Sequence, residues 1–204
     1  MKAHLQKLEV VRTWDEFESA DALRIVDWDA CAKQDVPRGH KGCRTYSKDD
    51  VPWLLNGKPP HAVEITCSLP MDMVTIELKK NAWRKDFTGQ CDAILFPASD
   101  VADDAVLFVE IKYSKSEDEK SLGRCRRDAR KQIEDTIQEL RNRECPLEER
   151  TLYGLISFPL LRSEIFGASM FDPTEGRLNY SQNQMALFVS NRVTYTDSRT
   201  IRPA

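Results

Sequence analysis

The sequence predicts an α/β protein whose mixed central β-sheet is flanked by helices. Apolar runs of strand length recur between residues 62 and 158, and several alternate apolar and polar side chains as half-buried strands do. A long amphipathic pattern over residues 122–142 separates two of these runs. A strand, a helix and a further strand in this order predict a crossover that returns the chain to the same sheet.

Composition is that of an ordinary water-soluble domain. The 204 residues predict a single domain, 1–204, with a core at about 62–158 and elaborations at 1–61 and 159–204. The formal net charge of -3 excludes a globally basic nucleic-acid binder, so any basic surface must be local. No apolar run approaches the roughly 20 residues of a membrane helix, and residues 1–7 lack the apolar core of a signal peptide. A cytoplasmic location with six reduced cysteines is expected.

Helices are expected near the N-terminus. Thr13–Glu16 has the pattern of a capping box, which predicts a helix through about Ile25. Residues 27–44 are polar and irregular in pattern. A second, shorter helix is expected from Ser47 to about Gly57, where glycine and proline stop it.

Strands are expected next in the chain. Residues 61–68 and 74–78 alternate in polarity, which predicts two half-buried strands. Residues 92–96 and 106–111 are apolar runs, and the connection between them, 97–104, has the composition of a hairpin turn. These two runs are therefore expected to pair as antiparallel neighbours.

The clearest helix follows the hairpin. Its apolar stripe recurs at three- and four-residue steps, at Leu122, Cys125, Ala129, Ile133, Ile137 and Leu140. Residues 151–158 then form another apolar run of strand length. A turn is expected at 172–176, and residues 185–195 are expected to supply one or two more strands.

Three charged residues lie inside the apolar runs of the hairpin. Asp92 begins the first run, and Glu110 and Lys112 end the second on one face, because alternate side chains of a strand share a face. Pairing of the two runs would bring Asp92 beside Glu110. Two carboxylates can hold Mg²⁺ together with waters and phosphate oxygens, and a neighbouring ammonium can orient water or stabilise developing negative charge.

This constellation resembles the signature of the PD-(D/E)xK, or restriction-endonuclease-like, nuclease superfamily. Asp92 is followed after seventeen residues by Glu110-Ile111-Lys112, and Gly89-x-x-Asp92 is similar to a common form of the first motif. Cys91 stands where the name-giving proline would be. The similarity covers about residues 74–158, where the order of strands and helix also resembles the family's core.

The resemblance implies a restriction-endonuclease-like core and a metal-dependent endonuclease or exonuclease. Asp92 and Glu110 would hold Mg²⁺ or Mn²⁺, and Lys112 would act on the attacking water. The implied partner is nucleic acid, DNA rather than RNA, with a role in bacterial defence or repair. A homodimer or a partner protein is compatible with this interpretation.

Family members often complete the site with a further acid and a glutamine. Glu77 is the first candidate for the acid, with Glu64 and Glu16 behind it, and each also fits an ordinary solvated position. Gln132 lies on the border of the helix's apolar stripe, so it either points toward the site or is a plain helix-edge residue.

Basic residues of the same helix could contact phosphates. Arg124, Arg127 and Lys131 share the helix face opposite the apolar stripe. The alternative is a solvated face balanced by nearby acids, and the sequence does not decide between the two.

Two other hypotheses stay open. A structural zinc site could be assembled from Cys31, His40, Cys43, His61 and Cys67, although no short Cys-x-x-Cys step is present. The chain could also be a catalytically inactive binding or interaction protein that keeps the nuclease fold. The acidic net charge favours this second hypothesis.

Overall fold

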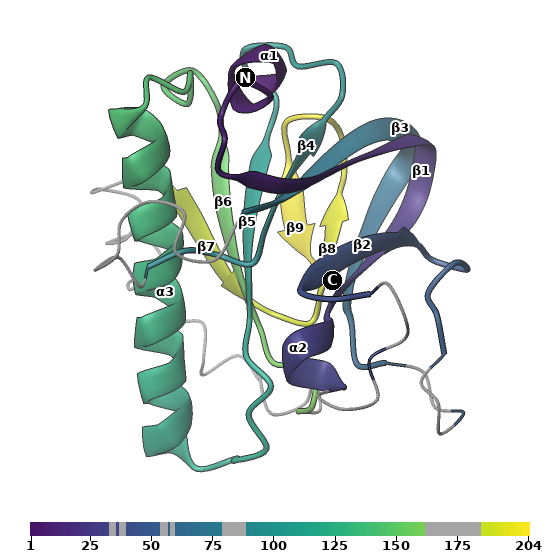
Figure 1. Cartoon of the computed structure of the whole chain (residues 1–204), viewed down its shortest axis with the longest axis vertical. Coiled ribbons are helices and arrows are strands. Elements are labelled where there is room, and N and C mark those ends of the chain that lie inside the picture. Colours follow the sequence, from purple (N-terminus) through teal and green to yellow (C-terminus); the bar gives the residue numbers. More distant parts are fainter. Residues whose placement is uncertain (33–35, 37–39, 54–56, 58–59, 79–88, 162–184) are drawn as a thin grey trace.

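A mixed β-sheet forms the centre of the molecule, as the sequence predicts. The computed structural model describes residues 1–32, 36, 40–53, 57, 60–78, 89–161 and 185–204 (Figure 1). Within them, nine strands form one sheet in the order β2-β1-β3-β4-β5-β6-β7, with β8 and β9 attached through β3. The strands are β1 (Val11–Asp27), β2 (Cys43–Ser47), β3 (Val63–Leu78), β4 (Ala93–Pro97), β5 (Val106–Ile111), β6 (Leu152–Ser157), β7 (Met185–Val189), β8 (Arg192–Tyr195) and β9 (Ile201–Pro203).

The central strands confirm the predicted hairpin and crossover. β4 and β5 pair antiparallel, with Ala93 opposite Val109 and Leu95 opposite Leu107. β6 pairs parallel to β5 and β7 parallel to β6, so the chain between β5 and β6 crosses over one face of the sheet. β5 therefore lies between two hydrogen-bonded neighbours and is held along its whole length.

The crossover contains helix α3 (Glu119–Asn142), which confirms the predicted long helix. The Asp118 side chain accepts a hydrogen bond from the Ser121 N–H at 2.8 Å and caps its N-terminus. α3 covers one face of the sheet (Figure 1), and its apolar stripe packs there against β3, β4, β5 and β6. The buried helix residues are Leu122, Ala129, Ile133, Ile137 and Leu140, and their sheet partners include Ile76, Ile94, Phe96, Phe108 and Ile156.

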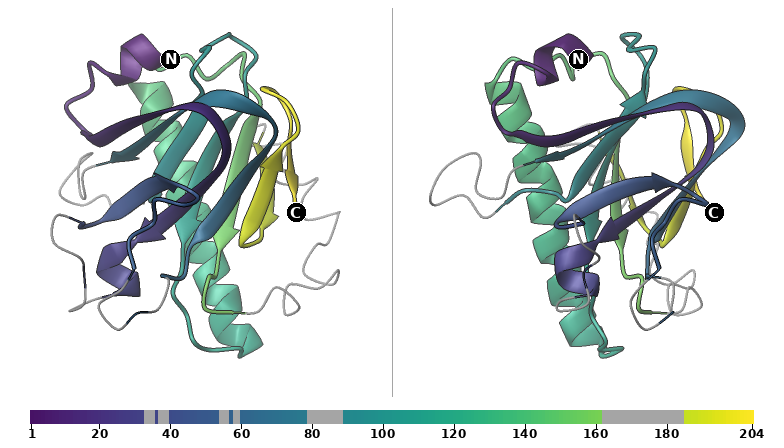
Figure 2. Two further views of the ribbon diagram at one scale, coloured as in Figure 1. Left: turned by 90° about the vertical axis from the view of Figure 1, so that its right-hand side faces the viewer. Right: turned by 45° about the vertical axis from the view of Figure 1, so that its right-hand side comes forward.

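A second core lies on the opposite face of the same strands. The long strands β1 and β3 curve around it, and Figure 2 (left) shows them in front of α3 together with β8 and β9. Register shifts between Val11 and Thr13 and between Phe17 and Ala22 mark the irregular part of the β1–β3 pair. The core itself contains Leu23, Ile25, Val63, Ile65, Leu95, Leu107, Val109, Leu155, Val193 and Tyr195.

The prediction of a helix that begins at Thr13 is wrong, because this segment forms strand β1. β1 pairs with β3 on one side and with β2 on the other. The glutamate that would complete a capping box instead accepts a hydrogen bond from Trp14 Nε1, through Glu16 Oε1 at 2.8 Å. Pairing with two partner strands satisfies the backbone groups that a local helix would have satisfied within itself.

Other N-terminal predictions also need correction. No helix follows Ser47 in the described residues: a turn spans 48–49, and Trp53 is irregular and 65% exposed. The two strands predicted around Pro70 are one continuous strand, β3. The irregular stretch 27–44 includes the end of β1, a short helix α2 (Trp28–Cys31) and the start of β2.

The C-terminal predictions have mixed outcomes. β7 and β8 confirm the one or two strands expected in residues 185–195. The turn expected at 172–176 lies outside the described residues. A further short helix, α1 (Lys2–Leu5), begins the chain. Across the described part of the chain, none of these helices combines the length and apolar character needed to cross a membrane.

Ile133 tests how far the fold depends on the contact between α3 and the sheet. Its side chain is fully buried in the α3 core. Ile133→Ala should lower the free energy of unfolding by about 2–5 kcal/mol, because it removes buried apolar atoms and leaves a cavity. Urea denaturation measures this loss, and Gln138→Ala on the exposed side of α3 is the control. Equal effects of the two changes would contradict the packing described.

Candidate functional site

Glu110 and Lys112 lie together at the carboxyl end of β5. The Lys112 ammonium lies 2.6 Å from Glu110 Oε1, and the backbone N–H of Lys112 donates to the Ser157 carbonyl at 2.8 Å. The Glu110 side chain is only 3% exposed, whereas that of Lys112 is 23% exposed. The second oxygen, Glu110 Oε2, is buried and has no hydrogen-bond partner in the described residues. A buried, unpartnered carboxylate oxygen is unfavourable unless something else supplies a cation or a donor.

Asp92 lies next to Glu110 across the hairpin. The Asp92 N–H donates to the Val109 carbonyl at 2.9 Å, and extension of the β4–β5 register places Asp92 opposite Glu110. Directly opposite residues of an antiparallel pair have Cβ atoms about 4.5–5.5 Å apart and share a face. Asp92 Oδ2 also accepts a hydrogen bond from the Ile111 N–H at 2.7 Å, which fixes the carboxylate beside β5.

Gln132 of α3 reaches the same place. Its Oε1 accepts a hydrogen bond from the Lys112 ammonium at 2.5 Å, and its Nε2 donates to the Gln90 carbonyl at 3.1 Å. Gln90 Nε2 in turn donates to the Leu78 carbonyl at 3.0 Å. The structure therefore places Gln132 toward the candidate site, where it holds Lys112 and ties α3 to the segment before β4.

Gly89 permits this close approach of backbone and helix. A Cβ atom built on Gly89 would lie 1.8 Å from Asp135 Oδ2 of α3, far inside van der Waals contact. Any other residue would push the segment away from α3 and lengthen the contact between Gln90 and Gln132. The glycine of the Gly89-x-x-Asp92 pattern thus has a packing reason.

Burial disfavours the ionised form of both carboxylates of the site. Burial raises the pKa of Glu110 to about 7, although the Lys112 ammonium acts in the opposite direction. Burial also raises the pKa of Asp92 well above its usual range, and the Glu110 and Asp27 carboxylates add to this effect. One ammonium is close to two carboxylates, so the site has a local excess of negative charge that a cation would relieve.

Asp27 is a site residue that the sequence did not indicate. It ends β1, and its side chain accepts a hydrogen bond from the Ala30 N–H at the start of α2. Its carboxylate lies near enough to Asp92, Glu110 and Glu77 to contribute to the raised pKa of each, after the larger effect of burial. No local signal identified it, because the approach of β1 to the hairpin depends on the curvature of the sheet.

Glu77 lies near these acids but on the other side of the sheet. The β3–β4 register pairs Ile76 with Ile94, so Glu77 shares a face with Ala93 and not with Asp92. Its Oε1 accepts hydrogen bonds from the Cys43 N–H at 2.8 Å and from Arg12 at 3.1 Å. Burial raises the pKa of Glu77, and its Oε2 is buried without a partner in the described residues.

The two remaining candidate acids are engaged elsewhere. Glu64 forms ion pairs with Arg24 at 3.0 Å and with Arg192 at 2.5 Å. Glu16 is exposed and pairs with Lys2 at 2.8 Å. The structure therefore does not bring either acid to Asp92 and Glu110.

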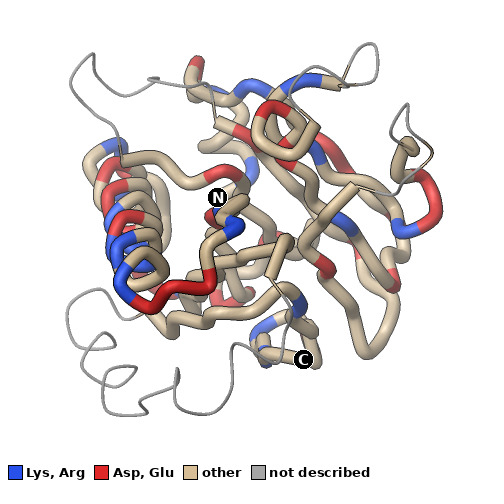
Figure 3. The backbone as a smooth tube through the Cα atoms, turned by 90° about the horizontal axis from the view of Figure 1, so that it is seen from below, with Lys and Arg blue, Asp and Glu red and all other residues tan. Residues whose placement is uncertain are grey.

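The basic residues of α3 lie on its exposed side. Arg124, Arg127 and Lys131 are all exposed. Acidic residues accompany them along the helix (Figure 3), and Lys131 forms an ion pair with Asp135 at 2.5 Å. This helix face offers cations to a phosphate backbone, but its net charge is smaller than the arginine and lysine pattern suggests.

The proposed zinc ligands do not form a site. His40 Nδ1 hydrogen-bonds the Tyr46 hydroxyl at 2.6 Å, and Cys43 is buried, where desolvation raises its pKa well above the usual range. All six cysteines are free. Within the described residues, no group of three or more His, Cys, Asp or Glu is arranged to hold a metal ion.

Asp92 and Glu110 nevertheless fit the needs of a magnesium ion. Mg²⁺ is usually bound by only one or two carboxylates, with waters and substrate phosphates completing its octahedron. Both residues supply hard oxygen donors on neighbouring strands, and Glu110 Oε2 is an oxygen without a partner in the described residues. The donor chemistry therefore suits Mg²⁺ or Mn²⁺ better than zinc, which prefers nitrogen and sulfur.

The charge on Glu110 should make stability depend on pH. Between its unfolded pKa near 4.5 and its folded pKa of about 7, the native state binds more protons, so stability falls as pH rises. Glu110→Gln should therefore raise the free energy of unfolding by about 1–3 kcal/mol at pH 8 and give no gain near pH 4. Denaturation at both pH values measures this, with exposed Glu18→Gln as control. An equal gain at both pH values would contradict the charge effect.

Known proteins do not decide what this site does. The chain matches no family model, no curated protein and no solved structure in the three comparisons made. The residues and their arrangement therefore carry the functional argument.

Proposed function

We propose that the protein is a metal-dependent nuclease that hydrolyses phosphodiester bonds of nucleic acid, with DNA as the preferred substrate. The observation that carries this proposal is the group formed by Asp92, Glu110 and Lys112 at the ends of paired strands. Glu110 is buried beside Asp92 with a single ammonium at 2.6 Å. Buried charged groups with shifted pKa values destabilise the folded state and are frequent at functional sites, so this group is a candidate site.

The order of elements supports the same proposal. β3, β4 and β5 are consecutive antiparallel neighbours, and α3 leads to β6, which is parallel to β5. A restriction-endonuclease-like core has this order, with its acid on the second strand and Glu-x-Lys on the third. Asp92 immediately precedes β4, and Glu110 and Lys112 lie at the end of β5.

Asp92 and Glu110 would hold Mg²⁺ or Mn²⁺, and Asp27 would add negative potential from β1. When bound, the ion would lower the pKa of a water and offset charge on the phosphate. Glu110 must be ionised to act as a ligand, so binding should weaken below its pKa of about 7.

Lys112 would act on the phosphodiester itself. Its ammonium can orient the attacking water and stabilise the negative charge that develops on the phosphate oxygens. The attacking water releases a proton to solvent as its oxygen forms the new P–O bond. The bond to the leaving deoxyribose oxygen breaks, and this oxygen takes up a proton from solvent. Gln132 keeps the ammonium beside Glu110 through its 2.5 Å hydrogen bond.

Binding without turnover is the alternative function. The net charge of -3 and the acids between the basic residues of α3 favour a weak or partner-assisted contact with nucleic acid. An inactive nuclease-like protein would keep the same sheet and helix but would not need an ionised Glu110.

Cleavage assays distinguish the two functions. With Mg²⁺ or Mn²⁺, the protein should cut plasmid or single-stranded DNA, and Asp92→Ala should abolish cutting. Lys112→Ala should lower the rate by about 100- to 1,000-fold, because it removes stabilisation of developing charge. Exposed Lys115→Ala is the matched control and should retain activity. Failure of the folded protein to cut any nucleic acid with either ion would refute the nuclease proposal.

Metal binding can be measured without activity. Mg²⁺ should raise the melting temperature of the protein, more at pH 8 than at pH 6, because protons compete for Glu110. Glu110→Gln should reduce this shift, and isothermal calorimetry should show the same loss of affinity. An equal shift in the protein and in Glu110→Gln would place the ion elsewhere.

A further inference from the structure

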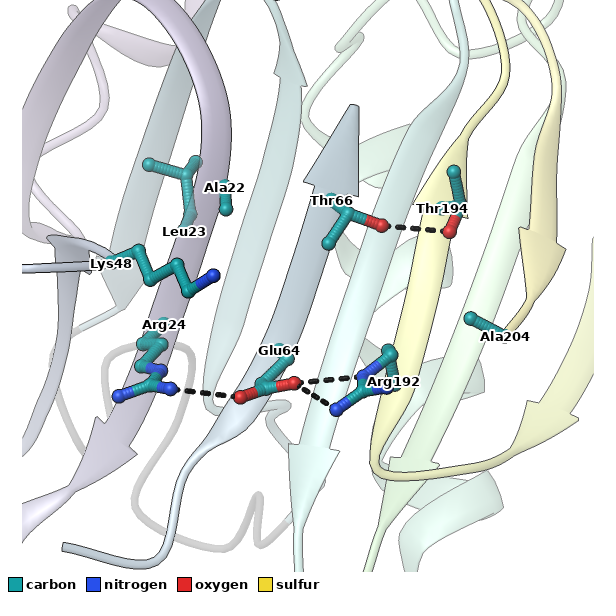
Figure 4. A pocket seen from close by; sticks show the side chains of 9 residues that line it. All are labelled: Ala22, Leu23, Arg24, Lys48, Glu64, Thr66, Arg192, Thr194 and Ala204. Atoms are coloured by element: carbon teal, nitrogen blue, oxygen red, sulfur yellow. Dashed lines mark hydrogen bonds and ion pairs between the residues drawn. The ribbon is translucent and has the colours of Figure 1, made fainter. Parts of the chain in front are cut away.

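A second charged group lies on β1, β3 and β8, on the side of these strands that faces away from the second core. Arg24 of β1, Glu64 of β3 and Arg192 of β8 lie in a row across three neighbouring strands (Figure 4). Arg24 donates to Glu64 Oε1 at 3.0 Å, and Arg192 donates to Glu64 Oε2 through Nε at 2.7 Å and through its terminal nitrogen at 2.5 Å. The two guanidinium groups are therefore held in fixed positions.

The row forms one end of a pocket with a volume of about 470 Å³. Lys48, in the turn after β2, also lines the pocket, and its side chain extends beside β1 next to the row (Figure 4). The other end carries hydroxyl groups, since Thr66 and Thr194 hydrogen-bond each other at 2.7 Å. Cations and hydroxyl groups together suit an anionic ligand with several oxygen acceptors.

The charge of this pocket is the reverse of that of the whole chain. Among the described residues that line it, the charged side chains are those of Arg24, Lys48, Arg192 and Glu64, whereas the chain has a net charge of -3. The described residues offer the Lys48 ammonium no hydrogen bond or ion pair. A guanidinium has five N–H donors, and the bonds to Glu64 use only one from Arg24 and two from Arg192. Donors and positive charge therefore remain for a ligand.

Partial exposure keeps these groups accessible. The side chains of Arg24, Glu64 and Arg192 are 30%, 29% and 57% exposed. An ion pair at such a position adds little stability, so the need to hold the strands together does not explain why two guanidinium groups pair with one carboxylate. The arrangement is more useful as a preorganised anion site.

We propose that this pocket binds the phosphate backbone of a nucleic-acid strand, as a contact area separate from the site of Asp92 and Glu110. The inference rests on the proposed function for the class of ligand, but it requires binding and not cleavage. Arg24, Arg192 and Lys48 would contact successive phosphates, and the threonine hydroxyls would donate to phosphate or sugar oxygens. This is the local basic surface that an acidic chain needs in order to bind nucleic acid.

Lys48→Gln is the decisive variant, because the described residues show no contact of its ammonium that the change would break. Fluorescence anisotropy with labelled single- and double-stranded oligonucleotides measures binding in EDTA, in an Asp92→Asn background that prevents cutting. The variant should bind about 2- to 5-fold more weakly at low salt, with a salt slope smaller by about one. Lys7→Gln removes the same charge from an exposed position near α1 and should bind like the parent.

Glu64→Gln separates an anion site from a structural ion-pair group. Removal of the Glu64 carboxylate leaves the two arginines without their acid, so nucleic acid should bind about 2- to 5-fold more tightly if the pocket contacts phosphate. Weaker or unchanged binding, with circular dichroism showing an intact fold, would overturn the proposal. So would equal effects of the lysine variants at positions 48 and 7.

Free phosphorylated compounds are tested in parallel. A thermal shift with inorganic pyrophosphate that depends on Lys48, without any effect of Lys48 on oligonucleotide binding, would replace the nucleic-acid ligand by a small phosphate compound. Loss of cutting in Lys112→Ala together with Lys48-independent binding would overturn this inference and leave the proposed nuclease intact. If binding depends on Lys48 but the protein never cuts nucleic acid, the nuclease proposal is overturned and this inference stands.

Discussion

The buried carboxylate of Glu110 is the constraint on which the candidate site depends. The Lys112 ammonium lies 2.6 Å from one of its oxygens, the other has no partner in the described residues, and Asp92 lies across the hairpin. The fold tolerates this arrangement because β5 is hydrogen-bonded to β4 and β6 and is covered by α3. A conflict between local charge and burial within an otherwise consistent core is expected at functional positions.

Two acid groups in the structure show how their surroundings change the pKa of a glutamate. Burial raises the pKa of Glu110, and the single ammonium of Lys112 only partly opposes it. Burial acts in the same direction on Glu64, but pairing with Arg192 and Arg24 outweighs it, and the pKa is lowered. The first group has an excess of negative charge and suits a cation, whereas the second has an excess of positive charge and suits an anion. The second group lies on β1, β3 and β8, on the side of these strands that faces away from the second core.

Curvature of the sheet decides which acids gather around the hairpin. β1 and β3 bend around the second core, and the end of β1 brings Asp27 near Asp92, Glu110 and Glu77. Cys43, opposite Asp27 in the β1–β2 register, is buried among all four carboxylates, which act with desolvation to raise its pKa. A flat sheet would keep the end of β1 two strands away from the hairpin, because β3 lies between them.

The sequence alone was sufficient to predict the hairpin, helix α3 and the strand that follows it. These elements depend on local alternation, on a short polar turn and on a regular apolar stripe, and the pleat of the paired strands then places Asp92 and Glu110 on one face. The helix period places Gln132 only at the border of the buried stripe, and the structure shows that its side chain contacts Lys112.

Tertiary structure decided the rest. Thr13–Ile25 has a helix-like local pattern, but pairing with β2 and β3 makes it a strand, and Asp27 reaches the acids only as a result. The contact between Glu64 and Arg192 joins residues 128 positions apart and depends on parallel pairing of β3 with β8. No local pattern encodes such a pairing, because its stability comes from burying the second core between distant segments of the chain.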